Sequence, residues 1–204
     1  MRVKICGITC VEDALAAAAA GADAVGLIFA PSPRRLSPER ARDIVAALPP
    51  LVTTVGVFVN ASLAYIRRVR DYCGLDLVQL HGDEDPATVA ALAPRVIKAL
   101  PLAPGRVPSA RVFPGAMLLL DAARPGQRGG TGVSFDWSLA RTLAEQRPVI
   151  LAGGLEPDNL ERAVQTVRPF ALDVCSGVEK RPGQKDHQKM ARFIARAKGL
   201  RRAA

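Results

Sequence analysis

Aromatic residues are scarce in this sequence: six Phe, two Tyr and one Trp make up 4% of its 204 residues. A hydrophobic core must therefore be built mainly from Ala, Val, Leu and Ile. Few rings are left to stack on nucleic-acid bases, as single-strand-binding proteins require. This scarcity argues against a nucleic-acid partner, although the net charge of +9 points to an anionic ligand of some kind.

Metal-ligand patterns and long apolar runs are also missing. The two histidines, His81 and His187, lie near none of the four cysteines, and no Cys-x-x-Cys pair occurs. We therefore expect no zinc or other metal site. No apolar stretch is long enough for a signal peptide or a membrane span. We expect a cytoplasmic protein with free thiols and no membrane partner.

The positive charge comes mainly from arginine, with 22 Arg against 6 Lys. It is concentrated near the C-terminus, where residues 180–204 hold nine basic side chains and one acid, Asp186. A basic last helix is more often a solvated face than a nucleic-acid contact. A nucleic-acid-binding protein, whose binding would depend steeply on salt, stays an alternative.

The composition is that of a globular protein, with 49% hydrophobic and 23% charged residues. A chain of this length buries roughly 70% of its unfolded surface, which is enough for a core without disulfides or metals. No linker, low-complexity segment or long repeat divides it. We expect a single domain over residues 1–204.

Short β-branched runs alternate with amphipathic stretches rich in Ala, Leu and Arg, which is typical of βα units around a parallel sheet. Strands are predicted over residues 3–5, 24–29, 53–59, 77–80, 96–99, 116–120, 149–152 and 171–174. Helices are predicted over residues 11–20, 38–48, 62–72, 85–92, 136–145, 157–167 and 186–198. Start signals for three of them are Ser37-Pro38, Asp136 and Glu156-Pro157.

Eight strands that alternate with helices in this order favour the α/β fold class, as a single closed (β/α)8 TIM barrel. A doubly wound sheet is disfavoured because the glycine-rich nucleotide fingerprint is missing after the first strand. Segment 101–115 holds four prolines and two glycines where the fifth barrel helix belongs. We expect a shortened or irregular helix there, one turn or plain loop.

Polar and glycine residues follow most predicted strands at the same end. In a TIM barrel this is the C-terminal face, where the active sites of the fold lie. The residues concerned are Cys6-Gly7, Asn60, His81-Gly82, Asp121, Gly153-Gly154 and Ser176-Gly177. Packing alone does not explain so regular a pattern, so we expect the active site among them.

Strand alternation predicts which side chains point into the barrel. Lys4 and Cys6 share one face of the first strand, and Asp173 and Cys175 share one face of the eighth. These polar sets are expected inside, because the opposite faces are uniformly apolar. The first and eighth strands are neighbours in a closed barrel, so we predict a buried Lys4–Asp173 ion pair.

Glycine loops after the seventh and eighth strands favour a phosphate site, because barrels often bind phosphate there through backbone N–H groups. The candidate residues are Gly153, Gly154, Ser176 and Gly177. A third loop, which contains Gly130, follows the sixth strand and could close over the ligand. We expect a small phosphorylated molecule as the partner.

Cys6 and Asp121 are the candidate catalytic residues, since they end the first and sixth strands on opposing sides of the barrel mouth. A small sugar fits between them, with one group as proton acceptor and the other as proton donor. A thiol needs cationic help to act as a base, which Lys4 could supply. The alternatives are an inert core cysteine and an aspartate that caps a helix.

Nine motifs then occur in the order found in one enzyme family. They are KICGIT at 4–9, SPR at 32–34, VGVFVN at 55–60, VQLHG at 78–82, LLD at 119–121, GGTG at 129–132, LAGGL at 151–155, DVCSGVE at 173–179 and GQKD at 183–186. Together they closely resemble the phosphoribosylanthranilate isomerase family of tryptophan biosynthesis, over essentially the whole chain. Cys175 departs from the pattern, where a serine or another small polar residue is expected.

This resemblance implies a cofactor-free Amadori rearrangement of N-(5′-phosphoribosyl)anthranilate to 1-(2-carboxyphenylamino)-1-deoxyribulose 5-phosphate. It implies Asp121 as the general acid at the ribose ring oxygen and Cys6 as the base that removes the C2′ proton. Arg34 is similar to the family arginine that faces the anthranilate carboxylate, which suits a guanidinium fork. The neighbouring Arg35 is the alternative, and motif position favours Arg34.

Arg34, His81 and Asp173 complete the candidate substrate-binding set. For His81 a structural hydrogen bond and a substrate contact stay equally open, while Asp173 is expected to hold the barrel mouth together. Glu179 and Lys185-Asp186 are expected to cap and orient the last βα loop. The chain is expected to be a monomer or a homodimer.

Two other interpretations are weaker. A pentose-phosphate epimerase would need metal-ligand histidines at strand ends, and His81 alone is available there. A thiol redox protein would have to pair Cys6 with Cys10, across a strand-to-loop junction with poor disulfide geometry.

Overall fold

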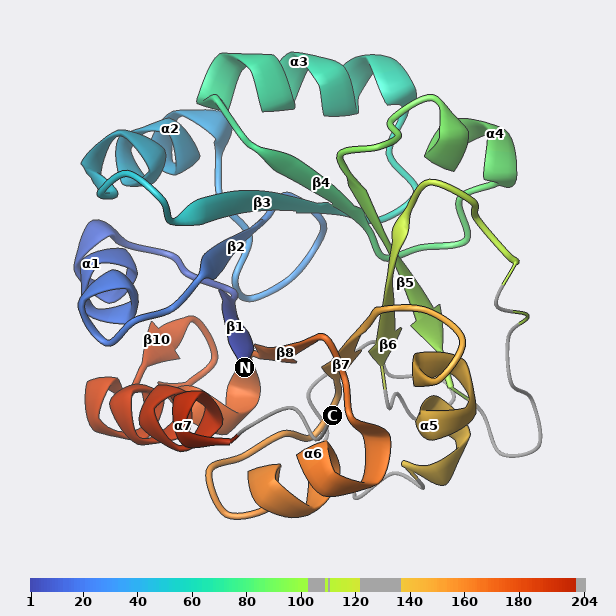
Figure 1. Ribbon diagram of the computed structural model, residues 1–204. Helices are drawn as coiled ribbons and strands as arrows, with labels where there is room; N and C mark the ends of the chain where they lie inside the picture. Colours follow the sequence, from blue (N-terminus) through green and yellow to red (C-terminus); the bar gives the residue numbers. More distant parts are fainter. Residues whose placement is uncertain (103–108, 110, 122–136, 201–204) are drawn as a thin grey trace.

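Eight parallel strands form a closed barrel in the computed structural model, which describes residues 1–102, 109, 111–121 and 137–200. They follow one another around the barrel in chain order: β1 (Arg2–Cys6), β2 (Ala24–Ile28), β3 (Thr53–Phe58), β4 (Leu77–Leu80), β5 (Val96–Pro101), β6 (Met117–Asp121), β7 (Val149–Ala152) and β8 (Ala171–Val174). β8 pairs with β1 and closes the ring. The predicted TIM barrel is confirmed (Figure 1).

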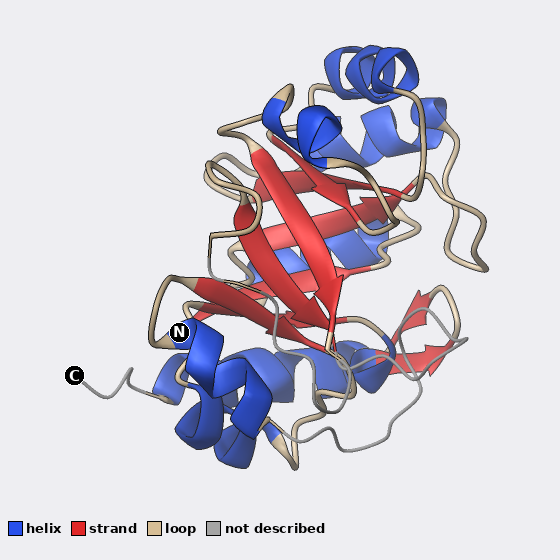
Figure 2. Cartoon of the chain, turned by 90° about the vertical axis from the view of Figure 1, so that its right-hand side faces the viewer, coloured by secondary structure: helices blue, strands red, loops and turns tan. Residues whose placement is uncertain are grey.

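Helices surround the barrel, so that the strands lie at the centre of the molecule (Figures 1 and 2). They are α1 (Val11–Ala19), α2 (Pro38–Ala47), α3 (Leu63–Cys73), α4 (Pro86–Ala90), α5 (Ser138–Ala144), α6 (Leu160–Val167) and α7 (His187–Gly199). A short 3-10 turn, η1 (Ser176–Val178), and a two-stranded antiparallel ribbon of β9 (Glu179–Arg181) and β10 (Gln184–Lys185) were not predicted. None of the helices in the described ranges has the length and hydrophobicity needed to cross a membrane.

Helix starts follow side-chain caps where the sequence offers them. The Ser37 hydroxyl accepts a hydrogen bond from the Arg40 amide, which confirms the predicted start of α2. The start predicted at Glu156-Pro157 is wrong, because the helix begins three residues later at Leu160. There the Asn159 side chain bonds the Glu156 amide and the Gly154 carbonyl and holds the chain in a turn. Asp136 lies outside the described residues.

The connection between β5 and β6 differs from the regular βα unit. Its described residues, 102, 109 and 111–116, form turns and no helix. A helix of the regular kind is therefore missing from this part of the segment, as the proline and glycine content predicts. Residues 103–108 and 110 of the segment lie outside the described residues.

Two apolar layers make up the core. The larger lies between the outer faces of the strands and the helices, where Ile5, Leu27, Leu118 and Phe193 are fully buried. The smaller fills the inside of the barrel with seven buried side chains, Val55, Ile97, Ala99, Leu119, Ile150, Ala152 and Ala171. Buried polar side chains also occur on the strands, and five of them are Lys4, Gln79, Lys98, Asp121 and Asp173. Such groups are stable only when they are paired, and their pairing builds the site.

Candidate active site

A cavity of about 760 Å³ opens at the C-terminal ends of the barrel strands. It is lined by nine of the ten residues that the sequence predicted for the site: Cys6, Arg34, His81, Asp121, Gly153, Gly154, Asp173, Ser176 and Gly177. The tenth, Gly130, lies outside the described residues. Barrel closure thus brings candidates from the two ends of the chain into one cavity.

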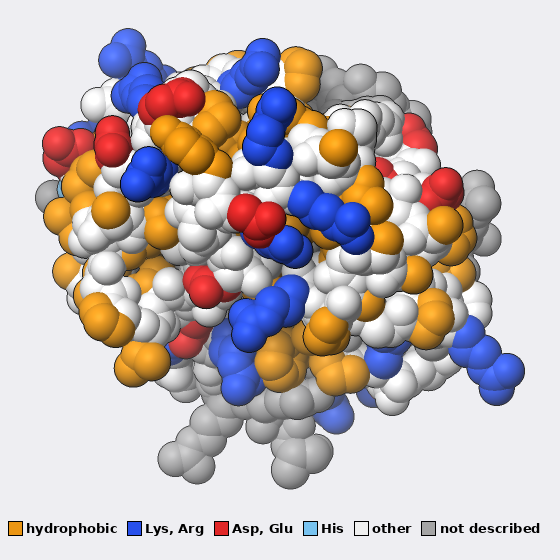
Figure 3. Space-filling view, turned by 90° about the horizontal axis from the view of Figure 1, so that it is seen from above, with side chains coloured by type: hydrophobic (Ala, Val, Ile, Leu, Met, Phe, Trp, Pro, Cys, Tyr) orange, Lys and Arg blue, Asp and Glu red, His pale blue; other side chains and the backbone are white. Residues whose placement is uncertain are grey.

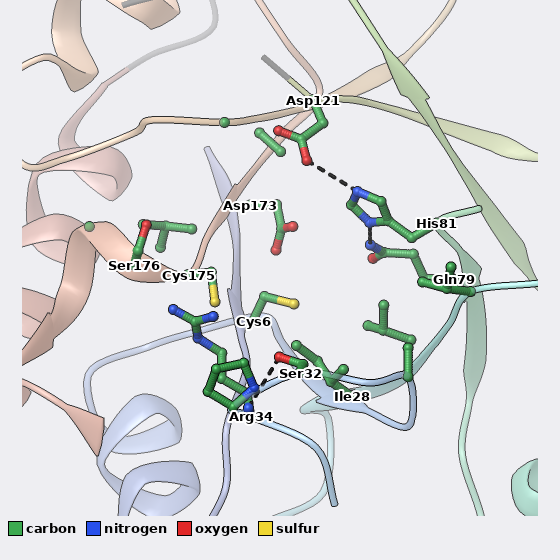
Figure 4. Close-up of a pocket in the computed structure, with 18 of the residues that line it drawn as sticks. Cys6, Ile28, Ser32, Arg34, Gln79, His81, Asp121, Asp173, Cys175 and Ser176 are labelled. Carbon is green, nitrogen blue, oxygen red and sulfur yellow. Dashed lines mark hydrogen bonds and ion pairs between the residues drawn. The ribbon is translucent and has the colours of Figure 1, made fainter. Parts of the chain in front are cut away.

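Asp121 ends β6 and is buried, with 5% of its surface exposed. Its Oδ2 atom lies 3.1 Å from Nε2 of His81, and the other ring nitrogen of His81 lies 3.0 Å from Nε2 of Gln79 (Figure 4). Asp121 Oδ1 has no hydrogen-bond partner among the described residues. One carboxylate oxygen is therefore fixed by the protein and the other is unused.

Cys6 ends β1, next to Cys175 just beyond the end of β8. The register pairs Ile5 with Val174, so the next residue of each strand comes side by side (Figure 4). The pKa of Cys6 is held well below its ordinary value, first by a hydrogen bond with the Cys175 thiol and then by the positive charges of Lys4 and Lys185. These effects outweigh burial, which by itself would raise the pKa. These contacts favour the thiolate, which is the form that can accept a proton.

Lys4 and Asp173 form the predicted ion pair inside the barrel. The Lys4 ammonium lies 2.8 Å from Asp173 Oδ1, and the side chains are 4% and 7% exposed. The prediction from strand alternation is confirmed. Burial raises the pKa of Asp173 to about 6, and the opposing charge of Lys4 only partly offsets this. Lys4 lies on the same face of β1 as Cys6 and contributes positive charge there.

Arg34 reaches the cavity from the loop after β2 and is held in place by Glu179. Its Nε and Nη2 atoms donate to the two carboxylate oxygens at 2.8 and 2.6 Å. Lys185 donates to the same carboxylate at 2.9 Å. Gly7 makes room for the arginine, because a Cβ atom there would lie 2.6 Å from Arg34 Cδ. Arg35, by contrast, is exposed and does not line the cavity.

The loops after β7 and β8 approach each other closely at the cavity rim. Gly153 and Gly154 both have positive φ, 86° and 63°, which suits glycine. A Cβ atom on Gly177 would overlap the backbone carbonyl oxygen of Leu155. Only glycine allows these two loops to pack together here, so their backbone borders the cavity directly.

Sequence reasoning missed the contacts that three residues make in the site. Gln79 belongs to the motif VQLHG, but nothing in the sequence indicated a role for its amide. Cys175 was expected to point into the barrel and departs from the family pattern, but its contact with Cys6 was not foreseen. Glu179 was expected to orient the last loop, whereas it also binds Arg34 from 145 residues away. Asp186, in agreement with expectation, caps α7 by accepting from two backbone amides.

A buried pair also supports the loop after β4. Lys98 donates to Glu84 at 2.7 Å and to the Gly82 carbonyl at 2.6 Å, and Glu84 accepts from the Asn60 amide at 2.9 Å. A lysine within the apolar run of β5 was the one sequence signal for it. Within the described ranges, no three His, Cys, Asp or Glu side chains are grouped so that they could hold a metal ion.

Residues 3–196 match the family model described as N-(5′-phosphoribosyl)anthranilate isomerase. This chain belongs to that family. Its relatives include the N-(5′-phosphoribosyl)anthranilate isomerase of Geobacter metallireducens, 52% identical over 97% of this chain and 99% of the relative. The Pseudomonas aeruginosa PAO1 enzyme of the same name is 51% identical over 99% of this chain and 97% of the relative.

Solved structures of phosphoribosylanthranilate isomerases share the whole fold. The enzyme of Thermotoga maritima has a TM-score of 0.88 and 45% identity, covering 98% of this chain and 100% of that one. A second structure, in complex with reduced 1-(o-carboxyphenylamino)-1-deoxyribulose 5-phosphate, has a TM-score of 0.84 and 44% identity, with the same coverage. Monomeric forms of the dimeric Thermotoga maritima enzyme are also similar, with a TM-score of 0.86 and 44% identity, over 98% of this chain and 100% of that one.

Proposed function

We propose that this chain carries out the Amadori rearrangement of N-(5′-phosphoribosyl)anthranilate in tryptophan biosynthesis, with Asp121 as general acid and Cys6 as general base. The observation that carries the proposal is their placement in one cavity. The thiol pKa is held low, and a carboxyl group has one oxygen fixed and the other unused. A proton donor and a proton acceptor are what this rearrangement requires.

The reaction moves protons first at the ribose ring oxygen, then at C2′, and finally at the 2′ hydroxyl and C1′. Asp121 gives a proton to the ribose ring oxygen, the bond from this oxygen to C1′ breaks, and the anthranilate nitrogen forms a Schiff base with C1′. Cys6 then removes the proton from C2′, and the electron pair moves to neutralise the nitrogen and leaves an enolamine. The enolamine becomes the ketone when its 2′ hydroxyl loses a proton and C1′ gains one.

The substrate carries two anionic groups, and the cavity offers a place for each. The phosphate is assigned to the backbone at Gly153, Gly154, Ser176 and Gly177, where the absence of bulky side chains allows close approach. The anthranilate carboxylate is assigned to Arg34, whose guanidinium Glu179 holds beside the cavity. Gly130 is proposed to add to the phosphate site from its loop.

A small dianion, rather than a nucleic acid, is the proposed partner for the positive charge. On the face seen in Figure 3, the Lys and Arg side chains stand in separate groups with Asp, Glu and apolar side chains between them. This arrangement supports the proposal, because nucleic acids bind to a continuous basic stripe or patch.

The remaining proposals concern the state of the protein. We propose one domain over residues 1–204, which acts without a cofactor, as a monomer or homodimer, in the cytoplasm. The four free thiols, two of them buried, agree with a reducing compartment.

The assay follows the loss of fluorescence of freshly made phosphoribosylanthranilate. We expect Cys6→Ser and Asp121→Asn each to lower kcat by about 10²-fold or more, the usual contribution of a positioned acid or base. Matched controls are Cys10→Ser and Asp71→Asn, which change the same residue types outside the cavity. Wild-type kcat in both site variants would overturn the assigned roles.

A further inference from the structure

Gln79 is a fully buried polar residue on β4 that the proposed chemistry does not use. None of its surface is exposed, and its side chain points into the barrel beside His81 (Figure 4). Its amide nitrogen lies 3.0 Å from His81 Nδ1, while its amide oxygen has no partner among the described residues. A buried amide with one unpaired atom carries a free-energy penalty, so its retention needs an explanation.

The two hydrogen bonds of His81 fix which ring nitrogen carries the proton. An amide nitrogen is only a donor, so Gln79 Nε2 donates to Nδ1, and Nδ1 must present its lone pair. A neutral imidazole has a single N–H, which then belongs to Nε2. Nε2 lies 3.1 Å from Asp121 Oδ2 and donates to it.

This donation decides where Asp121 can hold its own proton. If the proton of the acid form were on Oδ2, it would face the N–H of His81 and the hydrogen bond would be lost. The proton therefore belongs on Oδ1, the buried oxygen without a partner among the described residues. A general acid must direct its proton to the substrate, and because His81 occupies Oδ2, Oδ1 is the oxygen left for this role.

We propose that Gln79 is a positioning residue, which fixes His81 as the Nε2–H tautomer and thereby directs the acidic proton of Asp121 to Oδ1. This inference rests on the proposed role of Asp121 as general acid. The opposite orientation of the amide has opposite consequences. Gln79 Oε1 would accept from an Nδ1–H, Nε2 would become an acceptor, and the proton of Asp121 would be drawn to Oδ2.

Nitrogen-15 NMR of the imidazole rings distinguishes the two arrangements directly. The sequence contains two histidines, so histidine-labelled protein gives two sets of ring signals, and the variant His187→Asn identifies those of His81. We expect Nδ1 of His81 to resonate as an unprotonated nitrogen and Nε2 as a protonated one. A ring protonated at Nδ1, alone or as imidazolium, would overturn the proposal.

The variant Gln79→Glu tests the consequence for catalysis. A carboxylate can only accept, so it reverses the tautomer of His81 and draws the proton of Asp121 to Oδ2. We expect kcat to fall roughly 10- to 100-fold, part of the 10²–10⁴-fold that a positioned acid contributes, with KM changed by less than about threefold. Gln188→Glu adds the same charge at the exposed start of α7 and is the matched control.

A double variant separates an effect through His81 from a general structural effect. If Gln79 acts through this ring, Gln79→Glu causes no further loss of kcat once His81→Asn is present. Gln79→Met removes the hydrogen bond without adding charge, and we expect it to leave His81 in both tautomers and to lower kcat less than Gln79→Glu. Full kcat in Gln79→Glu, or equal losses with and without His81, would overturn the proposal.

The outcome also distinguishes this inference from the proposed function. Wild-type kcat in Asp121→Asn would overturn the assignment of the acid itself. A protein that requires Asp121 but has His81 protonated at Nδ1 would overturn only the role of Gln79.

Discussion

Replacing Lys4 by Met should destabilise the barrel by several kcal/mol, because it leaves Asp173 charged and alone in the interior. The two groups are 2.8 Å apart, and their side chains are 4% and 7% exposed. Breaking such a buried pair by removing one partner costs about 3–5 kcal/mol, since water cannot replace the lost cation. This is a large part of the roughly 5–15 kcal/mol that stabilises a typical domain.

The pH dependence of this loss follows from the pKa of Asp173, which burial raises from its ordinary value of 3.8 to about 6. The folded state then binds a proton more tightly than the unfolded state. Stability from this group is fully present below the unfolded pKa and is lost as pH rises through the folded pKa. Without Lys4 the pKa of Asp173 in the folded state rises further. We therefore expect Lys4→Met to lose more free energy of unfolding at about pH 8 than at about pH 5.

Urea denaturation provides the measurement. Trp137 is the sole tryptophan and is buried, so its fluorescence and far-UV circular dichroism report on the same transition. Coincident curves justify linear extrapolation to a free energy of unfolding. Arg141→Met is the control: its pair with Glu145 is exposed on α5, and its loss should change stability by less than about 1 kcal/mol.

The double variant Lys4→Met/Asp173→Asn removes both charges. We expect it to recover at least about half of the loss, because an unpaired buried charge and not the lost attraction is the main penalty. A deficit below about 1 kcal/mol in Lys4→Met, or no recovery in the double variant, would refute this account of the interior.

Three further predictions concern the active site. Cys175→Ala removes a hydrogen bond that lowers the pKa of Cys6, so the acidic limb of the kcat–pH profile should move to higher pH. Cys175→Ser should keep this limb closer to its wild-type position. An unmoved limb in the alanine variant would contradict the prediction. Gly177→Ala should raise KM by about tenfold or more, because the added methyl group overlaps the Leu155 carbonyl; a tenfold rise equals about 1.4 kcal/mol of lost binding free energy. Gly199→Ala is the control and should leave KM unchanged, because nothing lies within 4 Å of the added Cβ atom. Incubation with EDTA should leave turnover unchanged, and a collapse of activity would overturn the cofactor-free mechanism.

Much of the fold follows from local rules. Seven of the eight predicted strands end within one residue of the observed strand end, and β5 extends two residues further than predicted, to Pro101. Helix starts were reliable where a serine precedes a proline, as at Ser37. They failed at Pro157, because Asn159 holds a turn that no periodicity in the sequence indicates.

The candidate site could be predicted where chain position alone fixes a residue's place. Residues at the ends of parallel strands meet at one face of a barrel, so Cys6 and Asp121 could be placed in one cavity from their spacing. The Lys4–Asp173 pair followed from the two-residue period of strands and the neighbourhood of the first and last strands in a closed barrel.

What the sequence could not determine are the contacts between side chains. That Glu179 binds Arg34, that Cys175 lies beside Cys6, and that Gln79 reaches His81 all depend on rotamers and distances of an ångström or two. Strand periodicity fixes the face of a side chain but not its hydrogen-bond partner, which is set by how the closed barrel packs. The sequence by itself thus determined the barrel and the two candidate catalytic groups. Tertiary structure alone decided what holds Asp121, Cys6 and Arg34 in position.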